Sequence, residues 1–98
     1  MQFPDEGFIR FSNCGDGYES YGWIFDPAFV FDEPIILRLL QSTGSERVKA
    51  FLRTSDGERA YNYAGDTVEM LPIGFLSDSR IEVIASAGFP AKAFEARL

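Results

Sequence analysis

The 98-residue sequence contains no histidine, one cysteine (Cys14) and only two lysines among its nine basic residues. Without histidine the chain cannot form a Ser-His-Asp or Cys-His triad or a histidine-containing zinc site. A single cysteine permits no intramolecular disulfide and no multi-cysteine metal site. We therefore expect a non-enzyme that needs no metal or cofactor. Cys14 is expected to be a partly buried thiol, in a reducing cytoplasm or an assembled particle rather than in a disulfide-dependent secreted setting.

Long hydrophobic runs are also missing. The longest, "PIILRLL", is far shorter than the roughly 20 residues of a membrane span. No basic region followed by an apolar stretch opens the chain, so no secretory signal is expected. The net charge of −6 disfavours nucleic acid and anionic membrane surfaces as partners. Apolar residues make up 46% of the chain, which is enough for one packed domain spanning residues 1–98.

Carboxylates are the remaining candidates for chemistry. Asp26 with Asp32 or Glu33 could form the acid pair of a glycosidase, but these residues flank prolines and are better explained as caps of turns. Asp16, Glu19, Asp26 and Asp32 supply oxygen ligands without the spacing of a calcium-binding loop. The sequence also lacks a phosphate-binding loop and a dinucleotide fingerprint, and no motif in it is specific to a family.

The pattern of apolar residues predicts short strands separated by turns. The clearest element is a β-hairpin over 47–64, with its tight turn at Ser55-Asp56-Gly57. The segment 34–42 is nearly continuous apolar and is expected to be a central strand, although its propensity also allows a helix. The tail 90–98 is ambiguous, and a strand is favoured over a helix by a small margin. Further strands are expected at 7–13, 21–26, 28–32, 66–76 and 80–87.

Seven or eight short strands at this spacing predict an all-β fold, a small antiparallel β-sandwich or barrel. No stretch keeps a period of 3.6 residues, which argues against a helical bundle. The expected helix content is below about a fifth of the residues.

Residues 15–34 combine six aromatic residues with five carboxylates and contain no lysine or arginine. On a strand, Tyr21, Trp23 and Phe25 would share one face, and we expect Trp23 and Phe25 to anchor the core. The surplus of aromatic and acidic residues predicts a contact with a partner protein. The predicted partner-binding residues are Tyr18, Tyr21, Phe29, Phe31, Asp32, Glu33 and Phe51.

Three functions fit these features. The favoured one is a non-catalytic protein-interaction or assembly module that binds copies of itself or a larger assembly, such as a virion decoration, head–tail or tail component. The alternative is an acidic inhibitor, such as an immunity protein or an anti-CRISPR-like antagonist, that docks on a basic site. The third is a carbohydrate-binding module that uses Tyr18, Tyr21 and Trp23.

Overall fold

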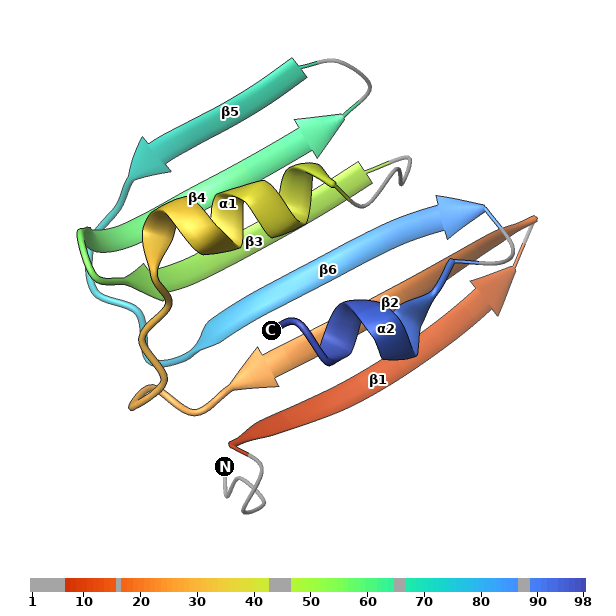
Figure 1. Ribbon diagram of the computed structural model, residues 1–98, viewed down its shortest axis with the longest axis horizontal. Coiled ribbons are helices and arrows are strands. Elements are labelled where there is room, and N and C mark those ends of the chain that lie inside the picture. Colours follow the sequence, from red (N-terminus) through yellow and green to blue (C-terminus); the bar gives the residue numbers. More distant parts are fainter. Residues whose placement is uncertain (1–6, 16, 43–46, 65–66, 87–88) are drawn as a thin grey trace.

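The computed structural model describes residues 7–15, 17–42, 47–64, 67–86 and 89–98, which form six strands and two helices (Figure 1). In chain order these are β1 (Phe8–Gly15), β2 (Tyr18–Phe25), α1 (Glu33–Gln41), β3 (Arg47–Thr54), β4 (Gly57–Ala64), β5 (Thr67–Pro72), β6 (Ser79–Ser86) and α2 (Ala91–Glu95). Within this part of the chain, no helix is long and apolar enough to cross a membrane.

The six strands form one antiparallel sheet in the order β1-β2-β6-β3-β4-β5. β6 is the last strand in the sequence but lies in the middle of the sheet, between β2 and β3 (Figure 1). The predicted all-β antiparallel fold is thus confirmed, with six strands in the described residues rather than seven or eight. Helices account for 14 residues, nine in α1 and five in α2.

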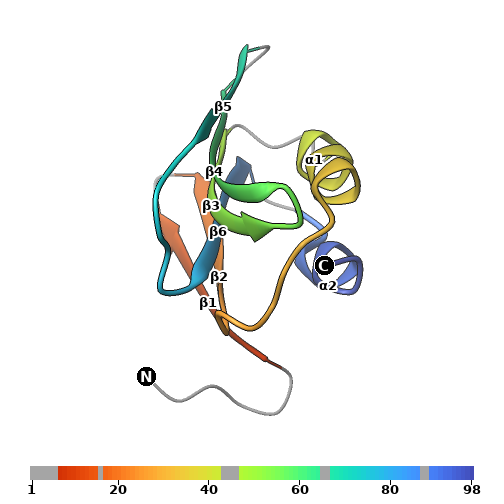
Figure 2. The ribbon, with the colours of Figure 1, turned by 90° about the vertical axis from the view of Figure 1, so that its left-hand side faces the viewer.

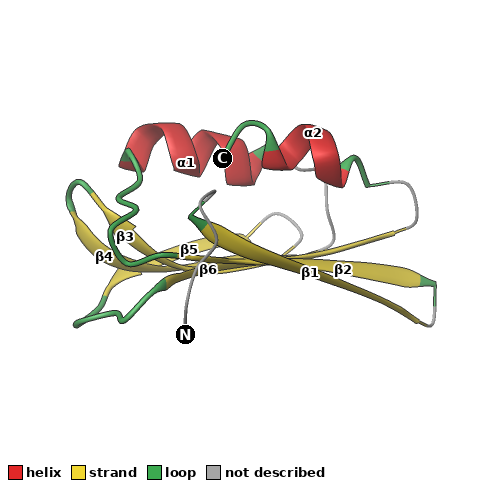
Figure 3. Cartoon of the chain, turned by 90° about the horizontal axis from the view of Figure 1, so that it is seen from below, coloured by secondary structure: helices red, strands yellow, loops and turns green. Residues whose placement is uncertain are grey.

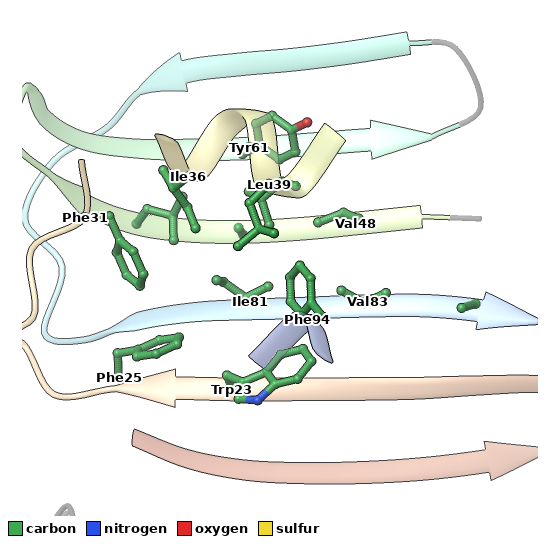
Figure 4. Close-up of a cluster of buried hydrophobic side chains, with 14 residues drawn as sticks. Trp23, Phe25, Phe31, Ile36, Leu39, Val48, Tyr61, Ile81, Val83 and Phe94 are labelled. Carbon is green, nitrogen blue, oxygen red and sulfur yellow. The ribbon is translucent and has the colours of Figure 1, made fainter. Parts of the chain in front are cut away.

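Both helices pack on the same face of the sheet, α1 over β3 and β4 and α2 over β2 (Figures 1, 2 and 3). The side chains that point toward them alternate along each strand, as the pleat requires. Trp23, Ile81, Ala50 and Tyr61 stand directly opposite one another across four adjacent strands and form one buried row of the core (Figure 4). The expected core residues Trp23 and Phe25 are both buried.

The prediction of a strand over 34–42 is wrong, because this segment forms α1. Asp32 caps the helix by accepting a hydrogen bond from the backbone N–H of Ile35 (3.2 Å), and Pro34 occupies the first turn, where no backbone donor is needed. Ile36, Leu39 and Leu40 are buried against the sheet. Their spacing of three and four residues is that of one helix face.

Two further strand predictions are also corrected. In the segment 28–32 only Phe31 pairs, through a single parallel bridge to Thr54. Its backbone N–H donates to Arg53 and its carbonyl accepts from Ser55, so the segment is pinned to the end of β3. The tail forms the short helix α2, which places Phe94 against Trp23 with a ring separation of 5.1 Å.

The hairpin predicted over 47–64 is confirmed. β3 and β4 pair from Arg47 with Ala64 to Thr54 with Gly57. Gly57 has a φ of +113°, a conformation that disfavours residues with a Cβ atom. Thr54 completes the turn by donating its hydroxyl to the carbonyl of Gly57 (2.6 Å). This turn fixes the register, and with it the face on which each β3 and β4 side chain lies.

Candidate protein interface

The face of the sheet opposite the helices is not covered by any described element (Figures 2 and 3). We call it the uncovered face. Phe51, Ala60 and Leu71 stand directly opposite one another on β3, β4 and β5 and form an apolar row on it. The exposed fractions of Phe51 and Leu71 are 36% and 61%. A shallow hollow of about 90 Å³ over this row is also bordered by Lys49, Asn62 and Glu69.

Charged residues surround the apolar row. The strands contribute four basic and three acidic residues to the uncovered face, a net charge of +1, although the whole chain carries −6. Lys49 lies opposite Glu82 of β6, and its ammonium nitrogen is 5.7 Å from the ring centre of Phe51. An accessible aromatic ring framed by basic and acidic groups is typical of protein–protein contacts. The basic residues of this face are Arg47, Lys49, Arg53 and Arg80.

Phe11 covers Gly22 on the β1–β2 side of the uncovered face. A Cβ atom added at Gly22 would lie 2.3 Å from Cζ of the Phe11 ring. Glycine therefore leaves room for the end of this ring over the neighbouring strand, where the ring shields the bare backbone. The group that approaches the Gly22 backbone is therefore an aromatic side chain.

Of the seven predicted partner-binding residues, Tyr18 and Phe51 lie on the uncovered face and have exposed side chains. Tyr21 lies on the helix side of the sheet. Phe29, Phe31 and Asp32 lie in the segment that leads to α1, and Glu33 is the first residue of α1. The structure therefore does not bring the seven together on one surface. Their role in binding stays a prediction, and the geometry favours Tyr18 and Phe51.

Tyr21 is half-buried beneath the tail of the chain. Its ring packs on Phe89 with a centroid separation of 5.4 Å, and its hydroxyl donates to the carboxylate of Glu19. That hydrogen bond, together with burial, raises the pKa of the Tyr21 hydroxyl. Tyr21 thus helps to hold the C-terminal segment on the sheet.

Phe29 and Phe31 belong to an aromatic cluster with Phe25, in which neighbouring ring centres are 4.9–5.1 Å apart. Phe31 is buried and Phe29 packs against the core from its edge. Glu33 forms an ion pair with Arg59 of β4 (2.9 Å), and Asp32 caps α1. These side chains thus have structural contacts within the chain. A capping role for Asp32 was expected from the sequence, whereas the aromatic cluster and the ion pair were not.

A second hollow, of about 510 Å³, lies between β1, β2 and α2, and Arg10, Trp23, Lys92 and Glu95 are among the residues that line it. The carboxylate of Glu95 accepts hydrogen bonds from Arg10 Nε (2.6 Å) and from Trp23 Nε1 (2.9 Å). The Arg10 hydrogen bond, helped by that of Trp23, lowers the pKa of Glu95. These polar groups bind one another and fix α2 on the sheet.

Cys14 is exposed, rather than partly buried as the sequence analysis expected, and it stands opposite Glu19 in the β1–β2 ladder. In the described ranges, no group of three or more histidine, cysteine, aspartate or glutamate residues is placed to hold a metal ion.

Over 79 residues the chain is 40% identical to the zinc chaperone YeiR of Escherichia coli (strain K12). The aligned region includes 80% of this chain but only 24% of YeiR, so the chain spans about a quarter of the length of the protein it matches. No family model and no solved structure matches the chain.

Proposed function

We propose that this chain is a non-catalytic protein-binding module of a protein of the zinc-chaperone type, and that the uncovered face contacts the partner. The observation that carries the proposal is the apolar row Phe51–Ala60–Leu71, which is exposed at Phe51 and Leu71, lies across three strands and is bordered by charged residues. The similarity to YeiR over most of the chain supports a role in zinc handling.

The geometry suits a protein partner because the row is broad and shallow. Its hollow of about 90 Å³ is well below the roughly 300–1,000 Å³ of a site that encloses a small molecule. A flat sheet face with apolar and aromatic residues at its centre and charges around it matches the centre-and-rim arrangement of a protein interface. Self-association or a larger assembly, as predicted from the sequence, is one form that such a contact takes.

The proposal is tested by placing the photocrosslinking amino acid p-benzoylphenylalanine at position 51 and irradiating cells that produce the chain. The matched control carries the same amino acid at position 35, because Ile35 is an exposed residue of α1 on the opposite side of the molecule. We expect position 51 to give a discrete crosslinked product that contains a zinc-binding protein, and position 35 to give none.

Other outcomes are informative in different ways. A crosslink from position 51 to copies of the chain alone would support self-assembly without a zinc-handling partner. The absence of any product specific to position 51 would contradict the use of the uncovered face.

Salt dependence separates this proposal from the acidic-inhibitor alternative. An inhibitor steered by its negative charge should lose association rate steeply as salt rises, because long-range attraction is screened beyond about 8–10 Å at physiological ionic strength. Association through the apolar row should change little over the same range. A steep loss, measured by stopped-flow or surface binding, would favour the inhibitor.

A further inference from the structure

β5 forms one edge of the sheet, and all six of its residues are exposed. The exposed fractions of Val68 and Met70, which lie on the helix side, are 43% and 40%, while Leu71 lies on the uncovered face. Phe75, in the segment that directly follows, is 84% exposed. An exposed edge strand with apolar side chains on both faces and no lysine or arginine is open to pairing with another strand.

The opposite edge of the sheet is better protected. β1 carries Arg10, whose guanidinium binds Glu95 and so connects the edge strand to α2. Among the described residues no comparable contact lies over β5, since α1 lies over β3 and β4 (Figure 1). The two edges differ in their readiness to accept a further strand, and β5 is the open one.

The hydrogen bonds of β5 show which of its backbone groups are free. The N–H of Ile73, which directly follows β5, donates to the carbonyl of Glu58, the residue opposite it when the β4–β5 register is extended by one pair. In an antiparallel ladder such bonded pairs recur at every second residue. Residues 67, 69 and 71 therefore bond to β4, while the backbone groups of Val68, Met70 and Pro72 point outward from the sheet.

We propose that β5 pairs antiparallel with β5 of a second copy of the chain, about a two-fold axis that passes through Met70. In this register Met70 faces Met70 of the second copy, and Val68 faces Pro72 of the second copy. The two Met70 residues exchange a pair of backbone hydrogen bonds, and each Val68 donates to the carbonyl of the opposite Pro72. Proline at this place removes only one donor on each side. The two sheets join into one continuous sheet of twelve strands.

The chemistry of the strand selects this register. A two-fold axis perpendicular to the sheet requires that residues opposite each other lie on the same face. An axis through Glu69 would satisfy this rule but would set two carboxylates directly opposite, which is unfavourable. The axis through Met70 instead joins Val68, Met70 and Pro72 of both copies into one apolar strip. It also offsets each Glu69, which then faces Leu71 of the second copy.

The first test uses disulfide trapping in a Cys14→Ser background, so that the engineered cysteine is the only thiol. Met70→Cys lies on the proposed axis, where its Cα–Cα separation of about 5.5 Å suits a disulfide. The matched control is Val68→Cys, which lies on the same face with a similar exposure. In the proposed register the two Val68 residues are four positions out of line, so roughly 13 Å apart. We expect mild oxidation to convert Met70→Cys to a covalent dimer and to leave Val68→Cys reduced.

The second test is sedimentation equilibrium of the 98-residue chain at several concentrations. We expect a monomer–dimer equilibrium whose Kd rises at least about tenfold in Met70→Lys, because two ammonium groups then face each other in place of two apolar side chains. Circular dichroism checks that the variant is folded.

Three outcomes would overturn the proposal. One is a chain that stays monomeric up to millimolar concentration. Another is a folded Met70→Lys that dimerises as well as the unmodified chain, and the third is equal trapping of the two cysteine variants. None of these bears on the crosslink at position 51, so the dimer and the proposed function fail separately.

Discussion

The two faces of the sheet are built from alternate residues of the same strands, yet they have different neighbours. On the face that the helices cover, called the covered face below, Trp23, Ala50 and Ile81 are buried beneath α1 and α2. On the uncovered face, Phe11, Phe51 and Leu71 remain exposed although they are equally apolar. The apolar character of a strand residue therefore does not decide its burial. The position of two short helices decides it, and this separates the residues that stabilise the fold from those available to a partner.

The largest expected loss of stability follows from a substitution on the covered face. Trp23→Ala should lower the free energy of unfolding by about 3–5 kcal/mol, because it removes a buried ring that packs on Phe94 and donates to Glu95. Phe51→Ala, the comparison on the uncovered face, should change it by no more than about 0.5 kcal/mol. Urea denaturation measures both. Equal losses would show that the uncovered face is part of the folding core.

The turn between β3 and β4 controls both faces, because it sets the register of the hairpin. Gly57→Val should cost about 1–2 kcal/mol, since φ is +113° and the new side chain would also crowd Arg59. Gly15→Val, at the end of β1, provides a control without a positive φ and without neighbours near its Cβ. The two midpoints of thermal unfolding should differ by several degrees. Similar midpoints would mean that the turn tolerates a side chain.

The substitution Gly22→Ala tests whether a position on the uncovered face tolerates a larger side chain as poorly as a position in the core does. Gly22→Ala should cost about 1 kcal/mol, because the methyl group displaces the Phe11 ring toward solvent. In a Phe11→Ala background the same substitution should be neutral or stabilising, since nothing then occupies the space. A double-mutant cycle gives the coupling directly. A coupling of zero would argue against the contact between the ring and the glycine.

The smallest expected change in stability concerns the ion pair that attaches α2 to the covered face. The hydrogen bond from Arg10 lowers the pKa of Glu95 in the folded chain below its unfolded value. The stabilisation is therefore complete above the ordinary glutamate pKa of about 4.3 and is lost as the pH falls through the lowered value. Because the Arg10–Glu95 pair is close to solvent, we expect it to contribute less than about 1 kcal/mol to the free energy of unfolding. Glu95→Gln should remove this part of the acid sensitivity, and an unchanged pH profile would contradict it.

The elements predicted correctly are those whose signal is local and strong. The hairpin 47–64 combines strict alternation with a turn that needs glycine, and its register follows from both. The core positions of Trp23 and Phe25 also followed from alternation along a strand. The antiparallel class could be predicted because short alternating segments recur along the chain.

The failures have a different origin. The segment 34–42 is too short and too apolar for its period to distinguish a buried strand from a helix. The decisive signals were the Asp32 cap, Pro34 in the first turn, and apolar residues three and four positions apart. The surplus of aromatic residues in 15–34 was interpreted as a partner surface, but Phe31 is buried in the core and Phe29 packs against that core. Part of the core is supplied by α1, a helix that the sequence did not predict.

The place of β6 in the sheet has a consequence for how the chain folds during synthesis. The pairs β1–β2 and β3–β4–β5 close through short connections and involve only neighbours in the sequence. In the described part of the sheet, β6 is the strand that joins them, so the two halves share no continuous sheet until residues 79–86 have emerged from the ribosome. Until then the inner edges of β2 and β3 are unpaired, which favours pairing with other chains. A chain that ends at residue 78 therefore holds α1 and five of the six strands, but not the strand that joins them into one domain.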